Sequence, residues 1–363
     1  MTELEKIDEL LEQISDLPPT HTKLLLLKET AKIADFIKDI DLGQYIRKNI
    51  VEVGLKSGDP LDAIAAFSWL LSMKDQYPED FDDDNYILWQ YKWILEHIDN
   101  FPEISLSKIE DMFEDMNVRY LREELSLRPY YNLQCRMHMR MGNKDLATSC
   151  YHKWMDTPKD EGSDCYACDV DSQAEFLIFS GMYEKAIEVA APILNQKIKC
   201  SEIPHLTFPR FLLPLLELGD YQRAELLHEK GYKLVSKTIG FMPSISSHML
   251  YLALTHTDKA LSLFEKHFSW AFYSINTYHR FLFYLSSLVL FSRLEKTGVR
   301  SVSISLQKEC DIFEKENLED LSSVVVWFKK ATLDLATVFN NRNGSDFMNQ
   351  FVDDRLKLID RTF

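Results

Sequence analysis

Four residues whose side chains bind soft metal ions fall into two short motifs near the middle of the chain. Cys165 and Cys168 form a C-x-x-C motif, and Cys200 is followed five positions later by His205. Thiolate and imidazole are the usual ligands of structural zinc, and three cysteines with one histidine form a common tetrahedral set. The sequence therefore indicates one structural zinc ion, with the ligands Cys165, Cys168, Cys200 and His205.

Other interpretations of these residues stay open. Their spacing matches no named zinc finger, so they are alternatively half-buried packing thiols beside an ordinary surface histidine. Cys150 and His152 lie before the C-x-x-C motif and are candidates to replace a missing ligand. A redox-active C-x-x-C pair requires a thioredoxin-like β-α-β context, which the sequence does not show.

Motifs for enzymatic chemistry are missing from the sequence. It contains no G-x-S-x-G elbow, no Walker loop, no dinucleotide-binding glycine fingerprint and no H-E-x-x-H motif. The acidic residues Glu110, Asp111, Glu114 and Asp115 have helical i, i+4 spacing, which is typical of a solvated helix face. We therefore expect that the chain is not an enzyme.

Composition and charge exclude several classes of protein. With 46% hydrophobic and 27% charged residues, 11 glycines and 12 prolines, the chain resembles a helical globular protein rather than a disordered or turn-rich β protein. A formal net charge of −16 argues against direct binding of nucleic acid, which needs clustered Lys and Arg. The acidity suits a basic partner or serves solubility.

The sequence also predicts where the chain works. Its most apolar stretch, residues 281–291, is too short to cross a bilayer, and the acidic amphipathic N-terminus is unlike a secretion signal. We therefore expect no membrane contact and a cytoplasmic location. The six cysteines are then reduced, which favours metal ligands or core thiols over disulfides.

A short sequence pattern, called the phrase below, recurs along the chain and predicts the helices that position these motifs. Residues 142–147, 181–186 and 219–224 share a G-x-x-x-x-A frame, and a shorter copy at 257–260 lacks the glycine. The three full copies recur at intervals of 39 and 38 residues. Repetition at this interval is typical of a stacked array of helix pairs.

Elementary helix chemistry explains the phrase. The glycine adopts the left-handed conformation that ends a first helix, and an acidic residue follows in the first turn of a second helix, where the helix dipole favours it. The alanine then lies where the two backbones pass closely. In such an array the starts of successive first helices are neighbours, which brings the two cysteine motifs together.

The phrase resembles the middle of a tetratricopeptide repeat. Tyr183 and Tyr221 occupy the aromatic position of that repeat, and Ala186 and Ala224 occupy its alanine position. The clear part of the resemblance covers residues 128–263, with a longer period than the usual 34 residues. The segment DCYACDVDSQAEFLIFSGMYEKAIEVAAPIL, with the later C-x4-H, is similar to uncharacterised tetratricopeptide-like proteins of Gram-positive bacteria, a resemblance that names no activity.

The resemblance implies an all-α fold, a right-handed superhelical stack of antiparallel helix pairs. We expect degenerate helical pairs in residues 1–125, tetratricopeptide-like repeats in 126–295 and capping helices in 296–363, in one continuous array. Outside the clear repeats we predict helices over 2–14, 20–39, 86–98, 106–116, 302–316, 321–339 and 346–359. No period-two alternation typical of strands is noted.

Such a stack favours a non-enzymatic scaffold that binds a protein or peptide on its concave face. Arginines are natural polar anchors on such a face, and the expected contacts are Arg136, Arg140, Arg210 and Arg280. Two alternatives stay open: an immunity protein that neutralises a basic toxin, and a peptide-responsive regulator. The first 50 residues contain no convincing basic helix-turn-helix, which weighs against the regulator.

Overall fold

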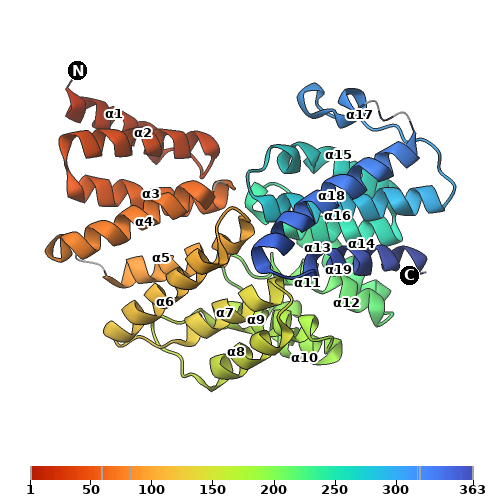
Figure 1. The fold of residues 1–363 in the computed structure, drawn as a ribbon, viewed down its shortest axis with the longest axis horizontal. Helices are drawn as coiled ribbons and strands as arrows, with labels where there is room; N and C mark the ends of the chain where they lie inside the picture. Colours follow the sequence, from red (N-terminus) through yellow and green to blue (C-terminus); the bar gives the residue numbers. More distant parts are fainter. Residues whose placement is uncertain (1, 59, 82–83, 317, 319, 362–363) are drawn as a thin grey trace. The chain divides into compact units, whose positions relative to one another are not determined.

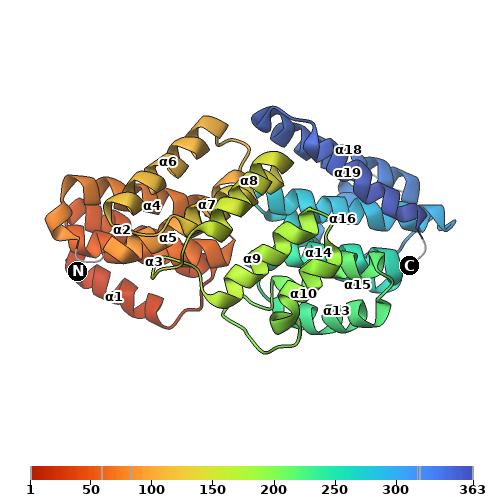
Figure 2. The same cartoon turned by 90° about the horizontal axis from the view of Figure 1, so that it is seen from below.

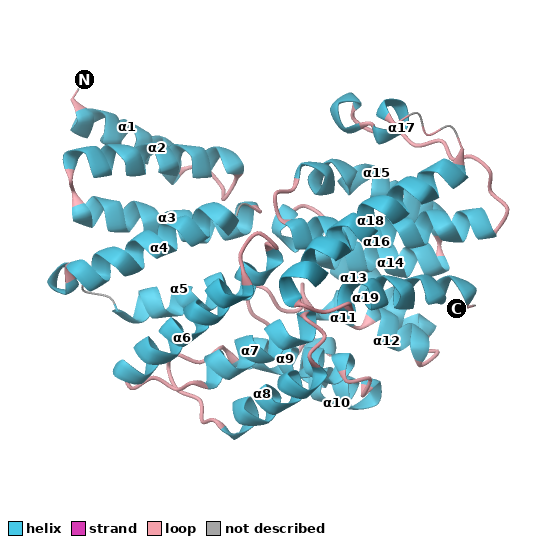
Figure 3. Ribbon diagram, in the orientation of Figure 1, coloured by secondary structure: helices cyan, strands magenta, loops and turns pink. Residues whose placement is uncertain are grey.

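The computed structural model describes residues 2–58, 60–81, 84–316, 318 and 320–361. Figure 1 shows that these residues form a succession of helices joined by short connections. The described residues contain no β-strand, as Figure 3 also shows. The predicted all-α class is therefore confirmed.

The chain divides into two compact units. The first comprises Met1–Leu133 with the short pieces Thr157–Ser163 and Thr238–Gly240, and the second comprises Gln134–Asp156, Asp164–Lys237 and Phe241–Phe363. The predicted division of one continuous array near residues 125 and 295 stays a prediction.

In the first unit each long helix packs against the next one along the chain. The helices are α1 (Glu3–Ser15), α2 (His21–Ile37), α3 (Ile40–Ser57), α4 (Pro60–Gln76), α5 (Asp84–His97) and α6 (Leu106–Arg122). Two 3-10 turns, η1 (Pro78–Asp80) and η2 (Ile98–Asn100), follow α4 and α5. The predicted helices over 2–14, 20–39, 86–98 and 106–116 coincide with α1, α2, α5 and α6.

A charged network holds the last three helices of this unit together. The Arg119 guanidinium donates to both carboxylate oxygens of Asp75 at 2.8 and 2.7 Å, and its Nε donates to Asp115 at 2.8 Å. The buried Tyr91 hydroxyl donates to the same Asp115 carboxylate at 2.7 Å. The network thus joins α4, α5 and α6 through hydrogen bonds to charged groups, which are the stronger kind.

The second unit contains the repeated phrases. α7 (Arg128–Arg140) begins in the first unit and continues into the second, where it is followed by α8 (Lys144–Asp156), α9 (Tyr166–Phe179), α10 (Tyr183–Leu194), α11 (Thr207–Arg210), α12 (Leu212–Glu217) and α13 (Tyr221–Val235). The three full phrases form the turns between α7 and α8, α9 and α10, and α12 and α13. Gly142, Gly181 and Gly219 in these turns are left-handed, with φ of 77°, 76° and 74°.

The alanine of each phrase is buried. Ala147, Ala186, Ala224 and Ala260 each have 0% of their surface exposed. A larger side chain at a fully buried position would overpack its surroundings. This burial agrees with the prediction that the alanines lie between the helices of a pair.

The remaining helices close the second unit. They are α14 (Met242–Thr255), α15 (Thr257–Tyr273), α16 (Thr277–Lys296), α17 (Ile312–Lys315), α18 (Leu321–Asn343) and α19 (Phe347–Lys357), with 3-10 turns η3 (Ile239–Phe241), η4 (Lys308–Cys310) and η5 (Leu358–Asp360). In Figure 2, α18 and α19 lie side by side as a pair. The apolar stretch 281–291 falls within α16, and no helix among the described residues has the length and apolarity needed to span a membrane.

One predicted helix is wrong. The sequence predicts a helix over 302–316, but residues 299–307 have no regular secondary structure, and only η4 and the one-turn α17 follow. Ser301, Ser303 and Ser305 are exposed, and the intervening Val302, Ile304 and Leu306 are half-buried. This alternation has the period of two of an extended chain, so the sequence does contain a short alternating segment there.

A buried histidine cluster fills the space between α13, α14 and α15. His228 Nδ1 lies 3.0 Å from His248 Nδ1, and the Tyr232 hydroxyl lies 2.9 Å from His267 Nε2. A Cβ at Gly231 would approach the His248 ring to 3.0 Å. Glycine is unfavourable inside a helix, and its presence in α13 is explained by the ring that occupies this space.

Acidification from pH 7 to pH 5 should destabilise the fold through this cluster. Burial, with a smaller contribution from Lys266, lowers the pKa of His267 to about 4 from its ordinary value of 6.5. The unfolded chain therefore binds this proton at higher pH than the folded chain. The stability is complete above pH 6.5 and is lost progressively as the pH falls toward 4.

Urea unfolding at the two pH values measures the effect. The free energy of unfolding should fall by roughly 2 kcal/mol between pH 7 and pH 5 because of His267. In a His267→Gln variant this part of the pH dependence should disappear. A variant with the same pH dependence as the parent would show that His267 is not responsible.

Candidate metal centre

Three of the four predicted zinc ligands come together in the structure. The Sγ atoms of Cys165, Cys168 and Cys200 all lie within 4.8 Å of one another, and those of Cys168 and Cys200 are 3.5 Å apart. No other group of three or more His, Cys, Asp or Glu side chains with this geometry occurs in the described part of the chain. The two cysteine motifs therefore converge as the repeat geometry predicts.

The start of α9 positions the C-x-x-C pair. Cys165 is the N-cap of α9, with extended backbone (φ −61°, ψ 160°), and its Sγ accepts the backbone N–H of Cys168 at 3.5 Å. Cys168 is in the first turn and thus lies on the same side of the helix end. A sulfur at a helix N-terminus is a favourable place for negative charge.

Cys200 reaches the same point from the turn after α10. Its backbone N–H donates to the Ile203 carbonyl at 3.0 Å, in a turn that includes the cis bond between Ile203 and Pro204. Beneath the sulfurs lies an apolar cluster of buried residues: Ala167, Val170, Ile193 and Ile203. This cluster fixes the start of α9 against the turn, and the thiols occupy its solvent-facing edge.

The arrangement fits a tetrahedral zinc ion. With a zinc–sulfur distance of about 2.3 Å, tetrahedral geometry separates the sulfurs by roughly 3.8 Å. The observed separations, 3.5 Å for one pair and at most 4.8 Å for the others, bracket that value, so small side-chain rotations close the set. Three thiolates would hold the ion and leave one position for a fourth ligand.

The pKa values of Cys165 and Cys168 are shifted in opposite directions. Burial acts to raise the pKa of Cys165, but hydrogen bonds from the Cys168 backbone and side chain outweigh it and lower that pKa below the ordinary value of 9.0. Burial, together with the neighbouring Cys200 and Cys165, raises the pKa of Cys168 well above 9.0. A cation among the sulfurs would stabilise the thiolate form of all three, because metal binding releases their protons.

His205 does not join the thiol group. Its ring stacks on Phe241, with ring centroids 5.3 Å apart and planes at 14°. Its Nδ1 is buried and has no hydrogen-bond partner among the described residues. Burial lowers the pKa of His205, which keeps the ring neutral, the form that binds metal. The prediction that His205 is the fourth ligand stays a prediction.

The two substitute ligands considered from the sequence lie elsewhere. Cys150 is buried in a separate cluster with Cys135 and Phe176, and its Sγ is 3.8 Å from the Gln134 side-chain oxygen. Neither Cys150 nor His152 belongs to the group of converging ligand atoms. Cys150 is therefore a packing residue in this structure.

Two of the predicted partner-binding arginines are engaged within the chain. Arg136 on α7 bonds through Nε to Glu175 of α9 at 3.0 Å. Arg210 on α11 pairs with Asp171 and, at 3.2 Å, with Glu175. The Thr207 hydroxyl also donates to Asp171, at 2.6 Å. This ladder of charges ties three successive first helices together.

The acidic residues of this ladder, Asp171 and Glu175, are not among those predicted from the sequence, although their spacing contains the information. Asp171 and Glu175 are four positions apart and therefore share one face of α9. Each bonds an arginine 39 residues away, Asp171 to Arg210 and Glu175 to Arg136. That separation equals the interval between two of the repeated phrases. Opposite charges spaced by one repeat therefore predict ion pairs between successive first helices.

The other two predicted arginines have different environments. Arg140 at the end of α7 is half-buried and interacts with other residues of the chain. Arg280 on α16 is half-buried, and its Nε is enclosed without a hydrogen-bond partner among the described residues. Their predicted contact with a partner is untested.

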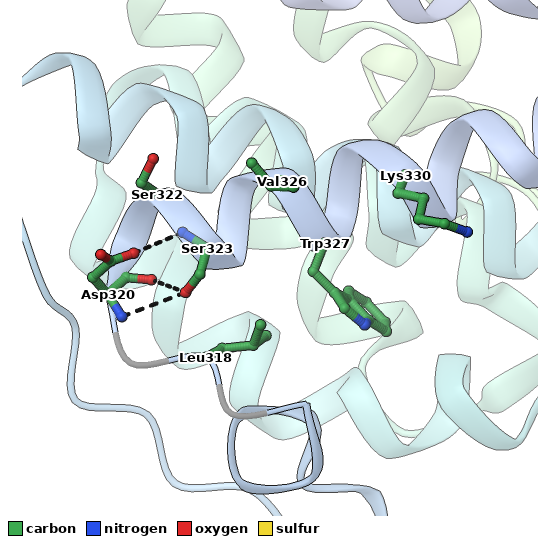
Figure 4. Close-up of a pocket in the computed structure, with 7 residues that line it drawn as sticks. All are labelled: Leu318, Asp320, Ser322, Ser323, Val326, Trp327 and Lys330. Carbon is green, nitrogen blue, oxygen red and sulfur yellow. Dashed lines mark hydrogen bonds between the residues drawn. The ribbon is translucent and has the colours of Figure 1, made fainter.

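The surface also has a shallow pocket at the start of α18, drawn in Figure 4. Asp320 and Ser323 in its wall form the capping box of α18, in which the Asp320 carboxylate accepts the Ser323 N–H at 2.7 Å. Trp327 and Val326 provide its apolar side. Asp320 and Ser323 are engaged in capping the helix, and Lys330 pairs with Asp334, so these polar groups have partners within α18 and its cap.

No protein-family model and no curated protein matches the chain.

Replacing Asp171 by Asn should strongly destabilise the second unit. The Asp171 side chain is only 5% exposed, and its removal as a charge leaves Arg210 without its closest partner. Breaking one side of a buried ion pair costs about 3–5 kcal/mol. As a control, Asp334→Asn disrupts the exposed Lys330–Asp334 pair and should change the free energy of unfolding by less than about 0.5 kcal/mol. Equal effects of the two substitutions in urea unfolding would contradict the role of the ladder.

Protein purified without added metal or chelator should contain about one zinc ion per chain. A Cys165→Ser, Cys200→Ser double variant should lose the metal and melt at lower temperature, because the thiolates that hold the start of α9 are removed. Cys310→Ser, which alters a buried cysteine outside the group, should retain the zinc. Elemental analysis with thermal melting tests both, and equal metal content in parent and double variant would exclude the site.

Proposed function

We propose that the chain is a non-enzymatic, zinc-stabilised scaffold of the tetratricopeptide type, and that it binds a protein partner. In this proposal its helix pairs continue the right-handed stacking of such repeats in the cytoplasm. The zinc ion joins the start of one repeat to the turn before the next, and His205 completes its ligand set. A closed four-ligand site of this kind is structural rather than catalytic.

The observation that supports partner binding is a recurrence of exposed apolar side chains. Leu146, Met182 and Tyr221 lie at the starts of the second helices α8, α10 and α13, and they are 51%, 39% and 48% exposed. Single exposed apolar residues are ordinary, and these three follow the glycine of their phrase by four, one and two residues. Their presence at the start of three successive second helices nevertheless favours an interaction surface there.

The charge ladder supports the same choice of surface. Arg136 and Arg210 face Asp171 and Glu175, so a partner that used these arginines on the first helices would have to break buried ion pairs. α14 is a first helix with no exposed residue at all. The exposed starts of the second helices are therefore better placed for contact than the first helices.

Capture with matched variants tests this proposal. The full-length chain is immobilised and exposed to lysate, beside a Leu146→Ser, Met182→Ser, Tyr221→Ser variant and a Phe36→Ser control. Phe36 on α2 is 76% exposed, more than any one of the three residues, so the control removes a prominent apolar side chain at another place. A protein retained by the parent and the control, but not by the triple variant, supports the proposal. Retention that is equal on all three columns would contradict it.

A further inference from the structure

The last helix of the chain and the residues after it contact two of the repeated turns. Phe347, the first residue of α19, covers Gly142 in the turn between α7 and α8, where a Cβ on the glycine would lie 2.2 Å from the ring. Arg361, just beyond α19 and η5, forms an ion pair with Glu217 at the end of α12. α19 therefore begins at the first full phrase and the chain reaches the third within fifteen residues.

The middle of α19 carries a cation stacked on an aromatic ring. The Arg355 guanidinium lies 4.5 Å from the centroid of the Phe351 ring. The same guanidinium interacts with Glu217 in the third turn. One face of α19 thus places an aromatic residue at i and i+4 and a basic residue at i+8, in positions 347, 351 and 355.

α19 is attached through few buried groups, which include the Met348 N–H that donates to the Asn340 side-chain oxygen at 2.9 Å. Met348 and Val352 are its only fully buried residues, and it packs mostly on α18 and less on α16. The ion pairs at its end are exposed: side chains of Lys296 and Asp360 are 49% and 78% exposed, and that of Arg361 is 50% exposed. Exposed ion pairs contribute about 0–1 kcal/mol each.

A short helix held in this way is a candidate for exchange. An isolated helix of this length is marginal in water, so α19 is helical because the surface beneath it supplies contacts. Its composition shows what that surface accepts: a helix with two aromatic anchors one turn apart and a cation near Glu217. Helix recognition by anchors at such intervals is a common mode of peptide binding.

We infer that the turn at Gly142 and the end of α12 at Glu217 form a helix-binding surface, which α19 occupies within the chain. The partner it fits is a protein that presents an amphipathic helix with aromatic residues at i and i+4 and Lys or Arg at i+8. Leu146 and Tyr221 lie beside the same turns and extend the apolar contact to a longer helix. This inference rests on the proposed partner-binding function and names the surface and the chemistry of the partner.

A peptide of this chain tests the surface without knowledge of the partner. The probe is a fluorescent peptide with the sequence of residues 345–361, and the receptor is the full-length chain carrying Phe347→Asp and Phe351→Asp, which removes the anchors of α19. The variant should bind the peptide at least ten times more tightly than the parent, whose surface is already occupied. Equal failure of both to bind, with far-UV circular dichroism unchanged, would overturn the inference.

A charge exchange tests the orientation of the bound helix. Adding Glu217→Arg to the variant should weaken binding of the natural peptide, and a peptide with Arg361→Glu should bind this receptor better than the natural one. If both peptides bind both receptors equally, the peptide does not follow the path of α19, and the inference is wrong.

Hydrogen exchange of the parent covers the case in which the aspartate variant does not fold. Amides of α19 should exchange faster than those of α18, because α19 detaches without global unfolding. Equal protection of the two helices would show that α19 is a permanent cap. Failure of these peptide tests leaves the lysate capture unaffected, and a negative capture leaves peptide binding unaffected, so the two proposals fail separately.

Discussion

The burial of one alanine after each left-handed glycine is the constraint on which the second unit depends. Ala147, Ala186 and Ala224 are fully buried and follow a left-handed glycine by five residues. Because the glycine reverses the chain and the alanine sets the separation of the helices, each phrase fixes one helix pair. Repetition of the pair then places the start of α9 next to the turn before α11, where the three thiols meet.

The sequence predicts those features that depend on local signals and on repetition. The repeated phrases predict the helix pairs, and the stacking of these pairs predicts that Cys165, Cys168 and Cys200 converge. The predicted helix over 302–316 is wrong because serines alternate with apolar residues in its first half, a pattern with period two that does not suit a helix. The alternation is only a few residues long and lies between segments with helical patterns, so it is easily overlooked.

Features that depend on the rotation of helices and on distant packing could not be predicted. Whether Arg136 and Arg210 face a partner or the chain depends on the angle at which α9 presents Asp171 and Glu175. The stacking of His205 on Phe241 likewise depends on the chain after α13 returning to this turn. The path of α19 over Gly142 and Glu217 joins residues more than 140 positions apart, as in the Arg361–Glu217 pair, and no local pattern encodes it.

The thiol cluster and the repeat turns have separate roles in this account. Metal at Cys165, Cys168 and Cys200 would add binding free energy to the junction of two successive helix pairs. The proposed helix-binding surface, which α19 covers within the chain, lies at other turns. X-ray absorption at the zinc edge of the purified protein tests the central claim most directly. The account predicts three sulfur neighbours at about 2.3 Å and one nitrogen neighbour at about 2.0–2.1 Å. A zinc shell without sulfur, or protein that retains no zinc after gel filtration, would contradict it.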